Sequence, residues 1–356
     1  MNTKTKVALL FGGRSVEHEI SIRSAQNVAA HIDKSLYDFA LIGIDKSGKW
    51  YLNEGVSPEI SRGKLLTLHL NPASPVLQAG NQELQIDVAF PVLHGTDGED
   101  GSIQGLFKAM GIPVVGSGVL GSALSMDKVI AKKVLKESGV PIAPYLCYSK
   151  NEKDKISFSD IVKNLGLPFM IKSASLGSSV GVSKVKKESD FLPALEESFV
   201  YDDKVIIEAF ISGRELECAV IGNTSPRASY PGEIVMIKDY DFYTYTAKYL
   251  DEDAIRIDLP AKVEEDVAQK IREISIKAYQ ALCCEDFARV DLFLTPDGEV
   301  VVNEINTIPG FTSASMFPMM WQNMGMSYSG LITELINQCL ERHKASKERE
   351  THYTVR

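Results

Sequence analysis

The sequence lacks long hydrophobic runs, paired cysteines and an excess of positive charge. Its first apolar run, Val7–Phe11, is too short for a signal-peptide core or a membrane span, and no later run approaches about eighteen residues. The formal net charge of −9 gives no overall field that would attract nucleic acid or anionic lipid. The cysteines form no CxxC pair and no histidine-containing ligand pattern, so we expect a cytoplasmic protein with reduced structural thiols at Cys147, Cys218, Cys283, Cys284 and Cys339.

What remains is the composition of an ordinary globular protein. The chain has 356 residues, of which 44% are hydrophobic and 24% are charged, a length typical of two or three domains. We expect an α/β protein with an N-terminal domain (1–121), a central unit (122–211), a C-terminal unit (212–342) and a charged, disordered tail (343–356).

The first unit alternates short apolar runs with polar helical stretches. This order predicts a parallel, Rossmann-like sheet, whose ligands bind beyond the carboxyl ends of the strands. Residues 46–85 are rich in Pro, Ser and Gly, and we expect an irregular surface elaboration there. The expected elements are a strand at Val7–Phe11, a helix from Ser15 or Glu17 to about His31, and strands at Tyr37–Ile44 and Val88–Leu93.

The other two units combine strands, two long helices and a closing helix. Lys238–Asp253 is aromatic and polar without clear periodicity, which favours a long functional loop. The expected elements are helices at Asp127–Ser138, Val263–Leu282 and Ile332–Leu340, strands at Phe169–Lys172, Lys204–Phe210 and 213–222, and a hairpin of Ala288–Leu294 with Glu299–Glu304.

A small-residue loop, Leu176–Gly181, follows Lys172 at a distance of four residues. Its glycines and serines would let backbone N–H groups approach an anion closely, with an ammonium nearby. The loop lacks the GK[ST] of a Walker motif, so a simple hairpin turn is the favoured interpretation of the loop taken alone.

The predicted hairpin carries candidate metal ligands. Alternation places Arg289 and Asp291 on one face of the first strand and Glu304 and Asn306 on one face of the second. Hard oxygen ligands in this number suit Mg²⁺ shared with nucleotide phosphates. A solvated strand face with one salt bridge is the alternative.

Other charged residues are candidates only in combination. Lys128, Lys172, Lys248 and Arg289 are the cations that could meet a triphosphate, although a single lysine is more often a surface residue. Glu208 could accept a hydrogen bond from a ribose hydroxyl. Glu17 and His94 follow two strand ends of the first unit and could converge on a small molecule there.

Eight separated motifs together closely resemble the D-alanine–D-alanine ligase family of bacterial ATP-grasp enzymes. The resemblance covers roughly residues 5–340 and implies an N-terminal Rossmann-like domain followed by a two-subdomain ATP-grasp fold. The motifs occur in the order GGRSVEHEIS, PVLHGTDGEDG, GSGVLGSALSMDK, IKSASLGSSVG, EAFISGRELE, YTAKYL, ARVDLFL and NEINTIPGFTSASMFP.

The resemblance implies that ATP lies between the second and third units, under the Gly177–Gly181 loop. It also implies two Mg²⁺ or Mn²⁺ ions on Asp291, Glu304 and Asn306. The residues implied for ATP are Lys128, Lys172, Ser179 and Lys248 on the phosphate side, Glu208, Ala209 and Ile211 around adenine, and Glu215 on the ribose.

The resemblance further implies two D-alanine molecules as substrates of peptidoglycan precursor synthesis. The first, bound through its ammonium by Glu17 with support from His94, becomes D-alanyl phosphate, and the amine of the second attacks it. Arg289 and the backbone N–H of Gly310 would stabilise the oxyanion. The remaining implied residues are Ser315 and Met316, which hold the second carboxylate with Ser178, and Tyr249, which forms a hydrogen-bonded triad with Ser178 and Glu17.

Two alternatives stay open at this point. A related ATP-grasp ligase could join D-alanine to D-lactate or D-serine, and a nucleotide-binding regulator could retain ATP binding without ligation. Glu17, Arg289 and Asn306 are all present, which favours the enzyme. A homodimer is expected from the resemblance alone.

Overall fold

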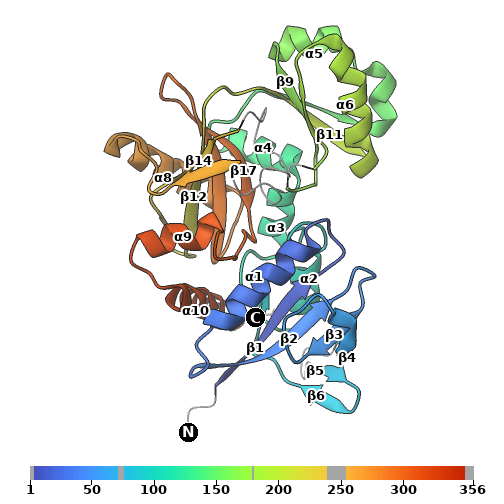
Figure 1. The fold of residues 1–356 in the computed structure, drawn as a ribbon, viewed down its shortest axis with the longest axis vertical. Helices are drawn as coiled ribbons and strands as arrows, with labels where there is room; N and C mark the ends of the chain where they lie inside the picture. The colour runs from blue at the N-terminus through green and yellow to red at the C-terminus, as the bar shows by residue number, and fades with distance from the viewer. Residues whose placement is uncertain (1–3, 71–75, 179, 239–253, 349–356) are drawn as a thin grey trace, which may run out of the picture.

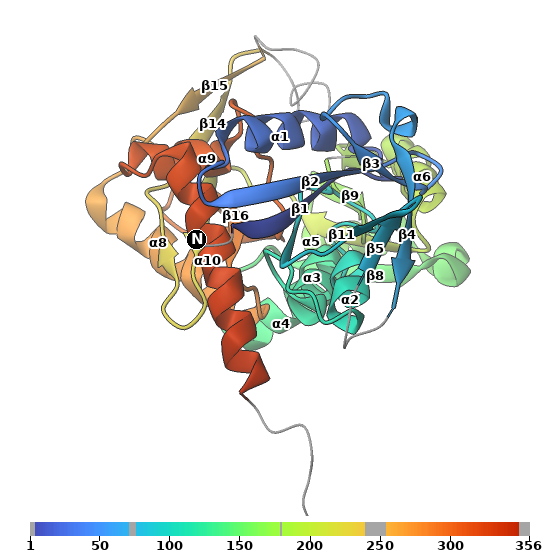
Figure 2. The same cartoon turned by 90° about the horizontal axis from the view of Figure 1, so that it is seen from below.

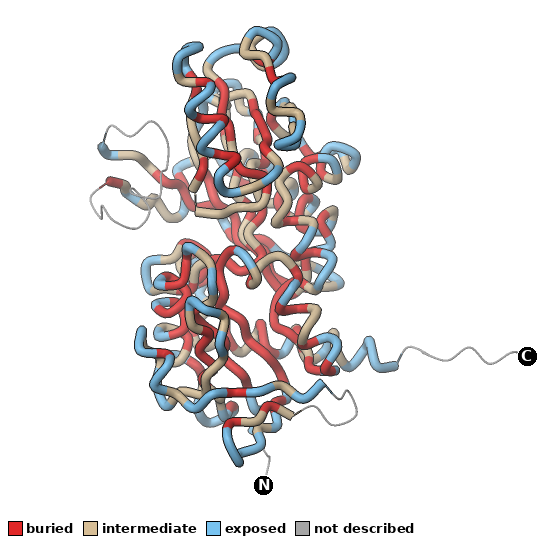
Figure 3. Tube along the Cα trace, turned by 90° about the vertical axis from the view of Figure 1, so that its right-hand side faces the viewer, coloured by how far each residue is buried: buried red, intermediate tan, exposed pale blue. Residues whose placement is uncertain are grey.

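The computed structural model describes residues 4–70, 76–178, 180–238 and 254–348. Within these residues the strands form three sheets, which belong to three consecutive units of the chain (Figure 1). Buried residues concentrate in the strands and in the helix faces that pack on them, while exposed residues lie on the outer helices (Figure 3).

The first sheet has a parallel centre, as the sequence predicts. Its strand β1 (Thr5–Gly12) pairs in parallel with β2 (Tyr37–Ile44) and with β7 (Val88–Pro91). Apolar side chains of β1 alternate between two cores, because successive residues of a strand point to opposite faces. α1 (His18–His31) covers one face and α2 (Ser102–Ala109) the other (Figure 2), and apolar residues of α10 (Tyr328–Lys347) belong to the same core cluster as those of α1.

The expectation of irregular structure at residues 46–85 is wrong. These residues extend the sheet by antiparallel strands, giving the order β6-β5-β4-β3-β2-β1-β7. The strands are short and most of their residues are partly buried or exposed, with Leu66 and Leu77 in the core, so alternation is too weak to be recognised in the sequence. The elements are β3 (Trp50–Asn53), a 3-10 turn η1 (Ile60–Arg62), β4 (Lys64–His69), β5 (Val76–Ala79) and β6 (Gln82–Leu84).

The second unit is an antiparallel sheet of order β10-β9-β11-β8 with helices on one face. The predicted helix is confirmed as α4 (Lys128–Glu137), whose N-cap Asp127 accepts from two backbone N–H groups. The other elements are α3 (Val119–Met126), β8 (Tyr145–Ser149), η2 (Lys150–Lys155), α5 (Phe158–Leu165), β9 (Phe169–Ser173), β10 (Val182–Val185), α6 (Glu188–Tyr201) and β11 (Lys204–Ala209).

The third unit is built on a second antiparallel sheet, of order β15-β14-β12-β16-β17 with β13 beside β12. The predicted strand, helix and hairpin are confirmed as β12, α8 and the pair β16–β17. The elements are β12 (Arg214–Ile221), β13 (Arg227–Ala228), β14 (Gly232–Met236), β15 (Ile255–Asp258), α8 (Glu265–Ala281), β16 (Phe287–Leu294), β17 (Val300–Asn306) and α9 (Met316–Asn323).

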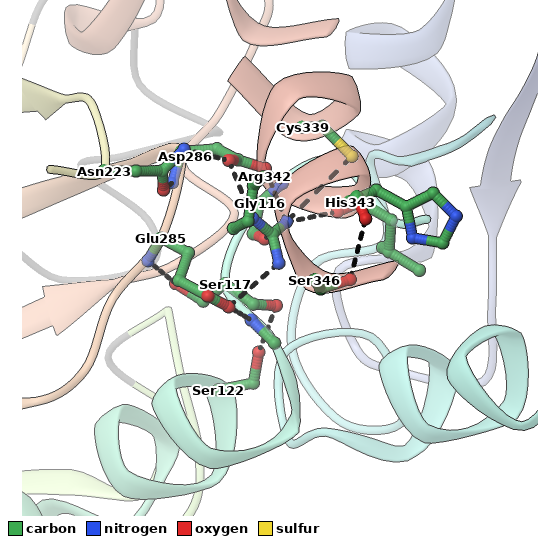
Figure 4. Close-up of polar contacts among 12 residues, drawn as sticks. Gly116, Ser117, Ser122, Asn223, Glu285, Asp286, Cys339, Arg342, His343 and Ser346 are labelled. Atoms are coloured by element: carbon green, nitrogen blue, oxygen red, sulfur yellow. Dashed lines mark hydrogen bonds and ion pairs between the residues drawn. The ribbon is translucent and has the colours of Figure 1, made fainter. Parts of the chain in front are cut away.

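The last helix, α10, continues to Lys347, so the first five residues of the expected disordered tail are helical. Arg342 anchors this end of the helix (Figure 4). Its guanidinium pairs with the fully buried Asp286 at 2.8 Å and donates to the carbonyls of Val114 and Gly116 at 2.9 and 3.0 Å. The helix therefore joins the third unit to the end of the first.

The described residues contain no helix that combines the length and apolar character needed to cross a membrane. The five cysteines have free thiols. Cys218, Cys284 and Cys339 are buried, and burial raises the pKa of the Cys218 thiol to about 11.

Candidate active site

A cleft of about 280 Å³ lies between the antiparallel sheets of the second and third units. Apolar side chains from both sheets line it, among them Met170, Ile234 and Phe293. Charged side chains line another part, including Lys128, Lys172 and Glu304. A cleft with an apolar part and a charged part suits a ligand that combines a flat ring with phosphates.

Two of the lysines predicted to bind phosphate, Lys128 and Lys172, lie within the described residues, and the structure brings them together at the cleft. Lys128 donates to the carbonyl of Leu176 at 2.7 Å and lies 3.4 Å from a carboxylate oxygen of Glu304. Lys172 donates to Asn303 Oδ1 at 3.1 Å. Both lysines belong to the second unit, and each contacts strand β17 of the third unit across the cleft.

The Glu208 carboxylate, a candidate acceptor for a ribose hydroxyl, pairs with two lysines. One oxygen pairs with Lys172 at 2.6 Å and the other with Lys132 at 2.8 Å. Burial opposes its ionisation, but the two lysines outweigh burial and lower the pKa of Glu208 to about 2. Ala209, Ile211 and Glu215 line the cleft as expected.

The hairpin β16–β17 presents its polar side chains to the cleft because of a β-bulge. Asp291 is paired with Glu304, but the next pair is Leu292 with Val302, so Asn303 is an extra residue. Val300 and Val302 face the core before the bulge and Ile305 does after it. The extra residue shifts the alternation, which leaves Glu304 and Asn306 on the same side as Asp291.

Asp291 is the centre of the polar contacts on this face. Arg289 donates to both of its oxygens at 2.7 Å, and Asn306 Nδ2 donates to Oδ2 at 3.0 Å. Arg289 Nε also lies 3.0 Å from Glu217 Oε2. Burial disfavours the charged guanidinium, but Asp291 and Glu217 more than compensate and raise the pKa of Arg289 well above its usual value.

The donor set of this face fits Mg²⁺ better than a metal that needs an all-protein site. Among the residues that the structure describes, no group of three His, Cys, Asp or Glu side chains could hold a metal. Asp291 and Glu304 supply two carboxylates side by side, and Asn306 can add an amide oxygen. Mg²⁺ usually takes one or two carboxylates and completes its shell with phosphate and water oxygens.

The loop after β9 meets the first unit at Glu17. The hydroxyl of Ser178 donates to Glu17 Oε1, and Ser178 has a φ of 55°, in the left-handed region. The other carboxylate oxygen, Oε2, lies against Gly95 and Gly177, where an added Cβ would stand only 2.8 and 3.1 Å away. The Glu17 carboxylate is thus enclosed by loops of two units that are far apart in the sequence.

His94 is buried and is held by hydrogen bonds of both ring nitrogens. Nδ1 lies 2.8 Å from the carbonyl of Ile308, and Nε2 lies 2.9 Å from Ser24 Oγ. Burial lowers the pKa of His94, although the nearby Glu17 opposes this. A neutral imidazole can donate to the carbonyl and accept from the hydroxyl, which fixes the loop at Ile308 against the first unit.

Gly310, Ser315 and Met316 lie close together, and the side chain of Met316 is buried. A Cβ on Gly310 would stand 2.7 Å from Ser315 Oγ, so a side chain at this position would displace the Ser315 hydroxyl. Ser315 is the N-cap of α9, and Met316 is buried in the core against Gly232. Met316 can therefore hold a substrate carboxylate only through its backbone N–H.

Three predicted site residues lie outside the described residues, namely Ser179, Lys248 and Tyr249. Three others were missed by the sequence analysis. Lys132 lies one helical turn after Lys128, which is the only signal for it. Glu217 lies two residues after Glu215, so both point to the same face of their strand. Glu99 lies in the motif PVLHGTDGEDG. Their burial could not be read from the sequence.

Glu99 joins the first and third units beside Glu17. Its oxygens accept from the backbone N–H of Gly95 at 2.8 Å and of Ile308 at 2.9 Å. Burial and the neighbouring Glu17 raise the pKa of Glu99 to about 8. The segment that leads to Gly310 is thereby fixed from the first unit by two residues, His94 and Glu99.

Two family models match the chain. The model described as D-ala D-ala ligase N-terminus matches residues 6–117, and that described as D-ala D-ala ligase C-terminus matches residues 134–337. The chain is 47% identical to a D-alanine–D-alanine ligase of Shouchella clausii, covering 97% of each. It is 45% identical to D-alanine–D-alanine ligase A of Escherichia coli K12, covering 98% of this chain and 99% of that one.

Solved structures of similar fold include two ligases. The D-alanine–D-alanine ligase from Coxiella burnetii has a TM-score of 0.86 and 36% identity, covering 97% of this chain and 96% of that chain. The VanG D-Ala:D-Ser ligase from Enterococcus faecalis has the same TM-score and identity, covering 94% of this chain and 99% of that chain.

Proposed function

The chain belongs to the D-alanine–D-alanine ligase family, and on that premise we propose how its residues join two molecules of D-alanine at the expense of ATP. The reaction is an ATP-dependent ligation that serves cell-wall synthesis. The observation that carries our assignment is the contact of Ser178 with Glu17, because it brings the loop that borders the nucleotide cleft against the substrate residue of the first unit.

ATP occupies the cleft between the second and third units. Adenine lies against the apolar part of the cleft beside Ala209 and Ile211, with Glu215 on the ribose. Lys128 and Lys172 supply positive charge to the phosphates, together with Ser179 and Lys248. Catalysis of phosphoryl transfer requires mainly positioning of the reactants and neutralisation of the phosphate charge, which these groups supply.

Asp291, Glu304 and Asn306 would hold two Mg²⁺ ions on the hairpin. The ions would neutralise charge on the transferring phosphate and orient it. Asp291 can accept from Arg289 and still ligate a cation, because each carboxylate oxygen has two acceptor sites.

Glu17 binds the ammonium of the first D-alanine, and His94 positions the surrounding loops. The carboxylate of this D-alanine attacks the γ-phosphate, giving D-alanyl phosphate and ADP. The amine of the second D-alanine then attacks the acyl phosphate, and phosphate leaves. Arg289 and the backbone N–H of Gly310 stabilise the oxyanion, a type of contact whose loss typically costs about 2.7–4 kcal/mol.

The second D-alanine binds through its carboxylate to Ser315, to the backbone N–H of Met316 and to Ser178. Tyr249 completes a hydrogen-bonded triad with Ser178 and Glu17. A phenol carries no positive charge near neutral pH, so Tyr249 adds no cation that would recruit anionic D-lactate. Relatives that are 45–49% identical carry the name D-alanine–D-alanine ligase, which favours D-alanine over D-serine and D-lactate.

The experiment that tests this function is product analysis after incubation with MgATP and a panel of D-amino and D-hydroxy acids. We expect D-alanine to stimulate phosphate release and D-alanyl-D-alanine to dominate the products. Phosphate release that does not respond to D-alanine would contradict ligation and favour a nucleotide-binding regulator. A depsipeptide or a D-alanyl-D-serine product would contradict the second-substrate assignment. We also propose a homodimer, which light scattering of the purified protein tests.

A further inference from the structure

Lys132 is a buried lysine that the ligation mechanism does not use. It lies on α4 one turn after Lys128, so both side chains project from the same face of the helix. Lys128 lines the nucleotide cleft, whereas Lys132 is only 2% exposed and lies behind it. The adjacent Lys133 is exposed.

Lys132 reaches the cleft through Glu208. Its Nζ lies 2.8 Å from Glu208 Oε1, and Glu208 Oε2 lies 2.6 Å from Lys172 Nζ. Lys172 in turn donates to Asn303 Oδ1 at 3.1 Å. Glu208 thus connects α4, β11 and β9 of the second unit, and Lys172 extends this connection to β17 of the third unit.

The charges of this cluster, Lys132, Glu208 and Lys172, do not cancel. Without Lys132, Glu208 and Lys172 would be a buried one-to-one pair with no net charge. With Lys132 protonated the cluster keeps one positive charge, and both Lys172 and Glu208 line the cleft. Burying a charged lysine is costly, since burial alone disfavours the ammonium, and an apolar residue of similar size would avoid this cost.

We propose that Lys132 is a positioning residue for the nucleotide, which holds Glu208 in place and keeps one positive charge at Lys172 for the phosphates of ATP. The proposal rests on the proposed function, because it takes ATP as the ligand of the cleft. Lys132 acts through Glu208 and touches neither ATP nor D-alanine.

The test is the affinity for MgATP of the full-length protein without D-alanine, measured by calorimetry. Lys132→Met keeps the length and apolar stem of the side chain and removes the charge. We expect its dissociation constant for ATP to rise at least about tenfold, and KM for ATP to rise more than kcat falls. The matched control is Lys133→Met, which we expect to bind ATP as the wild type does.

A second pair of variants separates charge from packing. Lys132→Arg keeps the positive charge beside Glu208 and should bind ATP within about threefold of the wild type, whereas Lys132→Gln removes the charge and should lose affinity as Lys132→Met does. If Lys132→Met does not fold, the comparison of Lys132→Gln with Lys132→Arg still decides. Wild-type affinity in a folded neutral variant, or a loss in a folded Lys132→Arg as large as in the neutral variants, would overturn the proposal.

These measurements are independent of the reaction catalysed. If the wild type binds ATP but forms no dipeptide, the proposed ligation fails while the role of Lys132 can still be judged. If the wild type forms the dipeptide and Lys132→Met binds ATP normally, only the role of Lys132 fails.

Discussion

Ser178 reaches Glu17 from a backbone conformation that L-residues rarely adopt. Its φ of 55° lies in the left-handed region, which costs roughly 1–3 kcal/mol for a residue that has a Cβ. Glycine would avoid this cost, as Gly181 does in the same loop with a φ of 66°. The position therefore keeps a hydroxyl where the backbone favours glycine, which is consistent with a use for the hydroxyl beside Glu17.

Ser178→Ala should lower kcat/KM for D-alanine about 10–100-fold, because a hydrogen bond to a charged group contributes about 1.5–3 kcal/mol. Initial rates at saturating ATP measure the effect. Ser183→Ala on strand β10 removes an exposed hydroxyl and is the matched control. A loss that appears only in the affinity for ATP would mean that the Ser178 hydroxyl serves the nucleotide instead.

Arg289→Ala should lower kcat by at least about 100-fold, since it removes an oxyanion donor. The structure adds a second consequence, because Asp291 and the buried Glu217 then lose their shared cation. Steady-state kinetics and thermal unfolding should be measured on the same sample. A change confined to KM for ATP would identify Arg289 as a phosphate ligand instead.

Glu208 should make the stability of the protein sensitive to acid. Its pKa is about 2 in the folded state against 4.5 as the ordinary value. Because the folded pKa is the lower one, the stabilisation is complete above pH 4.5 and is lost as the pH falls toward 2. The loss is about 3 kcal/mol over this interval.

Chemical denaturation of wild type and Glu208→Gln between pH 7 and pH 2 measures this contribution. The difference in unfolding free energy between them should stay constant down to about pH 4.5 and then shrink. A difference that does not change with pH would show that the carboxylate of Glu208 is not selectively stabilised by its two lysines.

At the scale of elements, the hairpin β16–β17 shows how one extra residue sets the chemistry of a strand. The sequence predicts the hairpin and the shared face of Glu304 and Asn306 correctly, because alternation within each strand is clear. It does not predict the bulge at Asn303, since strict alternation from Val300 would point Glu304 into the core. Bulges depend on pairing with the neighbouring strand, which a local pattern does not contain.

Glu304→Gln should nearly abolish turnover at low Mg²⁺ and leave the fold intact, because it removes one of two carboxylate charges from the face that holds the metal. The Mg²⁺ dependence of the rate, after treatment with a chelator, is the measurement. Glu299→Gln alters an exposed carboxylate of the same hairpin and serves as control. A near-wild-type rate of Glu304→Gln at low Mg²⁺ would refute the metal assignment.

At the scale of the whole molecule, the units are held together by buried polar contacts around Asp286. Its Oδ2 accepts from the N–H of Gly116 at 2.9 Å and its Oδ1 from Asn223 at 3.0 Å, and Arg342 pairs with both oxygens (Figure 4). Burial disfavours the charge of Arg342, but Asp286 and Glu285 outweigh this and raise its pKa. The sequence does not predict these contacts, because they join segments that are 56 to 228 residues apart and therefore leave no local pattern.

Arg342→Met should destabilise the protein by about 3–5 kcal/mol, because it leaves Asp286 as an uncompensated buried charge. Thermal or denaturant unfolding measures the loss. Lys344→Met, two residues later and exposed, should have little effect. Adding Asp286→Asn to Arg342→Met should restore part of the stability, and an equally unstable double variant would contradict the electrostatic explanation.

The packing of α10 has a consequence for how the chain folds as it is made. Leu331, Leu335 and Cys339 of this helix lie in the same core cluster as Val7 and Phe90 of the first sheet. A ribosome therefore releases the first unit long before the helix that completes its core. A nascent chain that ends near residue 121 must leave this apolar face exposed, so chaperone binding should persist until α10 has been synthesised.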